Sequence, residues 1–157
     1  MNKIKITTDL IKSLLPADDR IERYLEHYES QEFSLDQFSR LKEISGLDRI
    51  WVLCRLLNQD QVIVFCLDAA LRCLKLSANT SGYRVAEAAG SVFAATVPSG
   101  FDPTAISYSD FAIFAANAAA NVAGSKAALA DNNIAYAYAV GDKESIQVLV
   151  YLLEGET

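Results

Sequence analysis

Apolar residues recur at intervals of three and four along most of the chain, which is the spacing of one face of an α-helix. A short helix is expected over residues 9–15, because Pro16 cannot continue it. The next helix is predicted over residues 18–29, where the apolar stripe consists of Ile21, Tyr24, Leu25 and Tyr28. The chain therefore begins with amphipathic helices rather than strands.

Local capping signals place the following helices. Ser34 and Gln37 have the spacing of a capping box, which predicts a helix from this point to about Ile44. A break follows at residues 45–48, and a further amphipathic helix is expected over residues 47–57, ending at Asn58.

The segment 60–76 is the most apolar of the predicted helices. Its polar residues share one narrow stripe, so this helix is expected to be surrounded by neighbours. They are Gln61, Asp68, Arg72 and Lys75. Asp68 and Arg72 are four residues apart and are predicted to form an exposed ion pair, worth about 0.3–0.5 kcal/mol.

Alanine dominates the second half of the chain. After a helix expected over residues 83–95, the segment 96–104 contains Pro98, Gly100 and Pro103 and is predicted to be a structured loop. Fourteen of the residues 101–140 are alanine, the best helix former, and its small side chain lets helices pack closely. The pattern predicts helices over 107–130, 134–140 and 143–153, the last two separated at Gly141.

These elements predict an all-α fold, a bundle of about seven to nine helices in one domain covering residues 1–157. At 157 residues the chain has room for one core. Within the domain we expect acidic helices at 7–44, buried central helices at 47–95, the loop at 96–104 and alanine-rich helices at 105–153.

Composition narrows the function classes. The chain is 52% hydrophobic and carries a formal net charge of −6, whereas nucleic-acid-binding surfaces are basic. It has neither a signal-peptide pattern nor an apolar run typical of a membrane span in its first hundred residues. We therefore expect a cytoplasmic protein with neither nucleic acid nor membrane as partner.

Candidate chemistry is sparse. Three cysteines, with no CxxC pair, and a single histidine do not make a common zinc site. The cysteines are interpreted as small core residues, and no phosphate-binding glycine loop is present. The expectation is a protein that is not an enzyme, with no catalytic residues, metal or cofactor.

Acidic residues gather between residues 17 and 36, a segment that contains seven acidic residues and only two arginines. Such a face can steer a basic partner protein, and aromatic residues beside it are typical of interfaces. The alternative interpretation is a solvated helix surface. The candidate partner-binding residues are Asp18, Glu22, Tyr24, Glu26, Tyr28 and Glu29.

A second hypothesis from a different class is a small-ligand-binding protein with an apolar pocket near the 96–104 loop. Asn117 and Asn121 form a polar stripe on the alanine helix, which either fixes helix register or faces such a groove. Homo-oligomerisation is a further expectation, since a small chain with this much apolar surface can bury some of it in a two-fold interface.

Two motifs and the alanine-rich second half carry a family resemblance. The motifs are Leu47-Asp48-Arg49-Ile50-Trp51-Val52-Leu53 and Phe65-Cys66-Leu67-Asp68-Ala69-Ala70-Leu71-Arg72. Over residues 34–140 the chain resembles the small alanine-rich helical immunity proteins of bacteria and their phages, although the long Ala-Asp or Ala-Trp repeats of that group are absent here. The resemblance implies a cytoplasmic, non-catalytic binding protein, an immunity or accessory protein that neutralises a toxin, and it supplies no catalytic residues.

Overall fold

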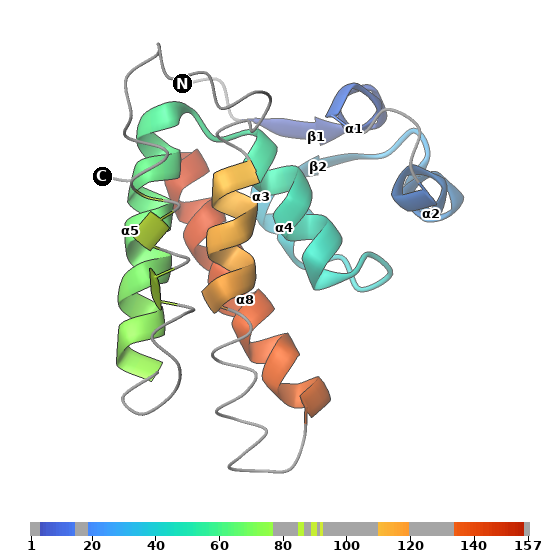
Figure 1. Ribbon diagram of the computed structural model, residues 1–157. Helices are drawn as coiled ribbons and strands as arrows, with labels where there is room; N and C mark the ends of the chain where they lie inside the picture. The colour runs from blue at the N-terminus through green and yellow to red at the C-terminus, as the bar shows by residue number, and fades with distance from the viewer. Residues whose placement is uncertain are drawn as a thin grey trace.

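Helices account for nearly all of the regular structure, which confirms the predicted all-α class (Figure 1). The computed structural model describes residues 4–14, 19–76, 85–86, 89–90, 92, 110–119 and 134–155. The predicted loop at 96–104 and the break near 131–133 lie outside these residues. Within the described residues, no helix is both long enough and apolar enough to cross a bilayer.

A two-stranded antiparallel sheet, which the hydrophobic pattern did not predict, joins the first helices. Strand β1 (Lys5–Thr7) pairs with β2 (Glu32–Ser34), with Ile6 opposite Phe33. Between the strands lie α1 (Thr8–Leu14) and α2 (Asp19–Tyr28), close to the predicted ranges. Ser30, with a φ of 66°, turns the chain from α2 into β2. Strands of three residues are too short to show a period of two, which explains why they were missed.

Helix α3 (Leu35–Ser39) begins with the predicted capping box but ends earlier than predicted. The Ser34 hydroxyl accepts from the Gln37 backbone N–H, and the Gln37 side chain accepts from the Ser34 N–H. The prediction that this helix reaches Ile44 is wrong. The helix closes in a tight turn at Arg40, whose backbone N–H donates to the carbonyl of Gln37. A guanidinium N–H of Arg49 donates to the carbonyl of Ser39.

Helices α4 (Gly46–Arg55) and α5 (Gln59–Leu76) follow within one or two residues of their predicted ranges. The inward face of α5 is fully buried, as expected for a core helix, and consists of Val62, Phe65, Cys66, Ala69 and Cys73. The expectation that α5 is surrounded on all sides is wrong. Val64, Leu67 and Leu71 are about half exposed on its other face, because its packing partners among the described residues lie on one side.

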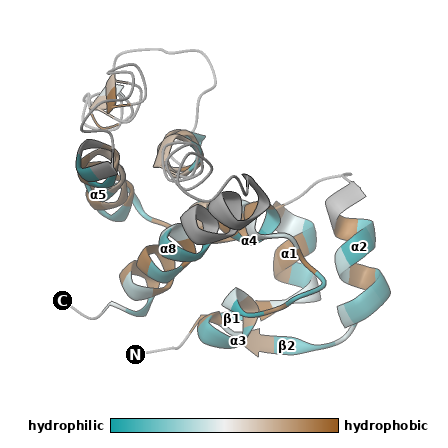
Figure 2. Cartoon of the chain, turned by 90° about the horizontal axis from the view of Figure 1, so that it is seen from below, coloured by the Kyte–Doolittle hydropathy of each residue, from teal (hydrophilic) through white to brown (hydrophobic). Residues whose placement is uncertain are grey.

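The last helix, α8 (Ile134–Glu154), is a single element rather than the two that were predicted around Gly141. A glycine inside a helix costs about 1 kcal/mol relative to alanine and does not by itself end it. Helix α8 contacts α3, α4 and α5. In Figure 2 it runs between α5 on one side and the small sheet with α1 and α2 on the other.

Residues 110–119 form a further helix beside α5. The Cys66 thiol of α5 donates to the carbonyl of Phe111 at 3.7 Å, and Arg55 of α4 pairs with Asp110 at 3.8 Å. Its buried positions are all alanine, in keeping with close helix packing: Ala112, Ala115, Ala116, Ala118 and Ala119. One core cluster extends from Ile6 in β1 to Leu153 in α8.

Candidate functional site

The predicted acidic face lies on the outer side of α2. Glu22, Glu26 and Glu29 are all exposed, and none of them forms an ion pair within the described part of the chain. Arg23, on the same helix, instead pairs with Asp48 of α4 at 3.6 Å. The negative charge of these three glutamates is therefore left facing solvent. We call Glu22, Glu26 and Glu29 the acidic surface; Asp18, also predicted to belong to it, lies outside the described residues.

Tyr24 does not belong to this surface, contrary to the prediction. Its side chain is only 2% exposed, because the apolar stripe of α2 turns toward the core. Burial raises the pKa of Tyr24 above its ordinary value, and the neighbouring Thr8 partly offsets this. Tyr24 thus packs α2 against the core.

Tyr28 lies at the border between the core and the acidic surface. Its ring packs edge-on against Phe33 at 5.3 Å, and its hydroxyl donates to a carboxylate oxygen of Glu43. This hydrogen bond lowers the pKa of Glu43 and raises the pKa of Tyr28. The predicted candidate Tyr28 is consequently held in place by Glu43, a residue that sequence reasoning did not single out.

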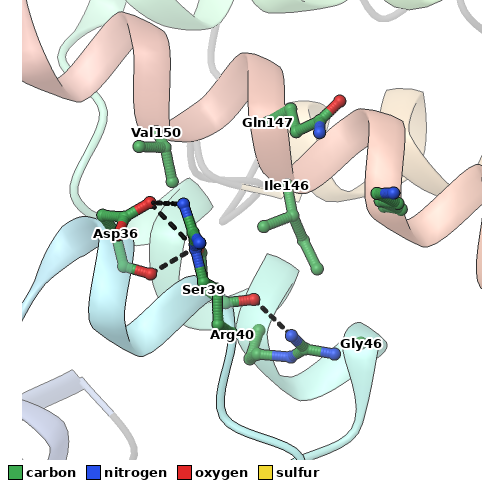
Figure 3. A pocket seen from close by; sticks show the side chains of 9 residues that line it. Asp36, Ser39, Arg40, Gly46, Ile146, Gln147 and Val150 are labelled. Atoms are coloured by element: carbon green, nitrogen blue, oxygen red, sulfur yellow. Dashed lines mark hydrogen bonds and ion pairs between the residues drawn. The ribbon is translucent and has the colours of Figure 1, made fainter.

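A pocket of about 730 Å³ lies between α3, the start of α4 and α8 (Figure 3). Sequence reasoning missed it, although its α8 residues have the spacing of one helix face. Most of its side chains are polar or charged. The lining consists of Asp36, Ser39, Arg40, Gly46, Arg49, Lys143, Ile146, Gln147 and Val150.

The charge of this pocket is opposite in sign to that of the whole chain. Three of its residues are basic and one is acidic, a formal balance of +2, whereas the chain carries −6. Arg40 is held against Asp36 at 2.7 Å, and Arg49 donates to the carbonyls of Ser39 and Ser45. We call Asp36, Arg40, Arg49, Lys143, Ile146 and Val150 the basic pocket.

The lining offers donors for an anion but no nucleophile paired with a base. The Ser39 hydroxyl donates to the Asp36 carbonyl at 2.7 Å, and Asp36 itself is paired with Arg40. Nucleophilic catalysis needs a hydroxyl or thiol hydrogen-bonded to a base. The lining residues can therefore donate hydrogen bonds to an anion.

The cysteines are buried in the core, as predicted. Cys54, Cys66 and Cys73 are all free thiols. Burial raises the pKa of the Cys66 thiol to about 12 and raises that of Cys54 further, which suppresses the reactive thiolate. The described residues contain no cluster of three or more histidine, cysteine or acidic side chains that could hold a metal ion.

The second predicted site lies mostly outside the described residues. This holds for the 96–104 loop and Asn121, so no pocket there is described. Asn117 is partly buried on the 110–119 helix, and Phe114 is exposed. Comparison of the chain with models of protein families, with curated proteins and with solved structures found no match.

Proposed function

We propose that this chain is a non-catalytic cytoplasmic protein-binding module, which contacts a basic partner protein through the acidic surface on α2. The observation that carries the proposal is the exposure of Glu22, Glu26 and Glu29 on one helix without an ion pair among the described residues. Such a surface attracts an oppositely charged partner and accelerates its association.

The resemblance to alanine-rich immunity proteins supports the same function. If the chain acts as an immunity protein, its partner is a toxin, and binding alone neutralises that toxin. No residue of the chain then needs to carry out a reaction. Tyr28, fixed by Phe33 and Glu43 beside the acidic surface, supplies the aromatic contact that interfaces favour.

The test compares two variants with equal loss of charge. The acidic-surface variant carries Glu22→Gln, Glu26→Gln and Glu29→Gln. The control variant carries three neutral replacements at exposed positions on α5 and α8, namely Asp60→Asn, Glu144→Gln and Glu154→Gln. Each immobilised protein is exposed to lysate of the source cells, and the association rate of the recovered partner is then measured at several salt concentrations.

We expect wild type and control to capture the same partner, and the acidic-surface variant to associate with it about tenfold more slowly at low salt. Added salt should narrow that difference, because it screens exposed charges. The proposal is refuted when no protein is retained by wild type. It also fails when the two triple variants associate equally fast with the partner.

A further inference from the structure

The basic pocket concentrates positive charge in an acidic protein. Arg40 directly follows α3, Arg49 belongs to α4 and Lys143 to α8, yet they line one space together with a single carboxylate, Asp36. Three cations against one carboxylate give this space a formal charge of +2, in a chain whose net charge is −6. The local potential therefore favours an anion where the protein as a whole repels one.

The inner wall of the pocket is apolar. Ile146 is only 5% exposed, and in Figure 3 its side chain points from α8 into the space between α3 and the start of α4. Val150, one helical turn further along α8, lies beside the Asp36–Arg40 pair. A ligand that fills this space places apolar surface on these two residues and its charged group among the basic side chains.

Two of the three cations already have hydrogen-bond partners in the protein. Asp36 holds Arg40 through both Nε and Nη2, and the carbonyls of Ser39 and Ser45 hold Arg49. Arg49 is partly buried and held by two carbonyls, so it loses less conformational entropy than a free side chain when a ligand binds. Lys143 is exposed and has no ion pair within the described residues, so its ammonium can turn toward an incoming anion.

From these three observations we propose that the basic pocket binds a small amphipathic anion, a molecule with a short apolar body and one carboxylate or phosphate group. Its volume of about 730 Å³ falls within the usual range for small-molecule sites. This inference goes beyond the proposed function and is independent of it, since the acidic surface and the basic pocket share no residue.

The test uses four probes with the same six-carbon chain. Hexanoate and hexyl phosphate carry the two candidate anionic groups, hexanol is neutral and hexylamine is cationic. Titration calorimetry gives the affinities, and backbone amide shifts of the labelled protein locate the binding. We expect at least one anion to bind about tenfold or more tightly than hexanol, with the largest shifts at Ser39, Gly46 and Gln147. Which of the two binds more tightly identifies the anionic group.

Substitution of Lys143 provides the matched variant test. Lys143→Gln removes a charge from a side chain that forms no hydrogen bond within the described residues, and Lys75→Gln removes another exposed lysine, on α5 and outside the pocket. We expect Lys143→Gln to weaken anion binding about two- to fivefold, and Lys75→Gln to leave it unchanged. The proposal is overturned when neither anion binds more tightly than hexanol, when the shifts lie elsewhere, or when the two lysine variants behave alike.

Discussion

The ion pair between Asp68 and Arg72 should stabilise the fold by more than its sequence spacing predicts. In the structure Arg72 Nε lies 2.6 Å from Asp68 Oδ2, and the Arg72 side chain is only 14% exposed. Its Nη1 also donates to Ser145 of α8 at 3.3 Å, and Ser145 is fully buried. The pair therefore ties α5 to α8, rather than lying in solvent as was predicted.

A second pair in the same protein supplies the control. Asp36 and Arg40 have the same residue types, the same spacing of four and nearly the same distance, 2.7 Å, but are 55% and 76% exposed. An exposed pair of this kind is worth about 0.3–0.5 kcal/mol. A hydrogen bond to a charged group in a less solvated place is worth about 1.5–3 kcal/mol. Because Asp68 is still 39% exposed, we expect a coupling of about 1–2 kcal/mol.

Double-mutant cycles measure both couplings directly. The variants are Asp68→Ala, Arg72→Met and their combination, with Asp36→Ala, Arg40→Met and their combination as control. Urea denaturation at pH 7 gives the free energy of unfolding at low and high salt. Only the Asp68–Arg72 coupling should exceed 1 kcal/mol and persist in high salt, because partly buried charges are screened less. Equal couplings for the two pairs, or complete loss of the Asp68–Arg72 coupling in salt, would refute the reasoning.

Two further predictions follow from the pKa shifts. Because the pKa of Cys66 is about 12 against an ordinary 9.0, its thiolate fraction at pH 8 is about a thousandfold lower. In the native protein, all three buried thiols should therefore stay unreacted with a disulfide reagent. In denaturant, three thiols per chain should react. A thiol that reacts at the free-cysteine rate in the native state contradicts this prediction. Tyr28→Phe removes the hydrogen bond to Glu43, whose folded pKa lies below its ordinary 4.5. The bond thus stabilises the fold above pH 4.5 and is lost as the pH falls through the folded value, so the stability difference between wild type and Tyr28→Phe should shrink between pH 6 and about pH 3. A difference that is constant over this range, in denaturation curves measured at each pH, would rule the interpretation out.

Local signals predicted most helices of this chain because their information lies within a few residues. The capping box of Ser34 and Gln37 was predicted from the sequence and is present, and the apolar stripe of α2 was identified with its range nearly correct. The same stripe already contained Tyr24. Placing that tyrosine on a binding surface conflicted with the helical period, and the buried ring in the structure follows the period.

The basic pocket could not be predicted in this way, because it depends on which helices pack together. Lys143, Ile146 and Val150 share one face of α8, a pattern visible in the sequence. Nothing local, however, shows that this face packs against α3 and the start of α4. Charged residues from separate helices become one site only through the tertiary fold.

One contact lies both at the end of α3 and at the missed pocket. Arg49 donates to the Ser39 carbonyl, the last carbonyl of α3. The same contact holds the guanidinium of Arg49 at the pocket, where α3 ends and α4 begins. The helical pattern of the sequence assigns Arg49 to α4. That pattern gives no information on a hydrogen bond from Arg49 to Ser39, ten residues earlier in the chain. The wrong helix end therefore lies beside the residues that form the proposed anion site, because Arg49 bonds the last carbonyl of α3 and also lines the pocket.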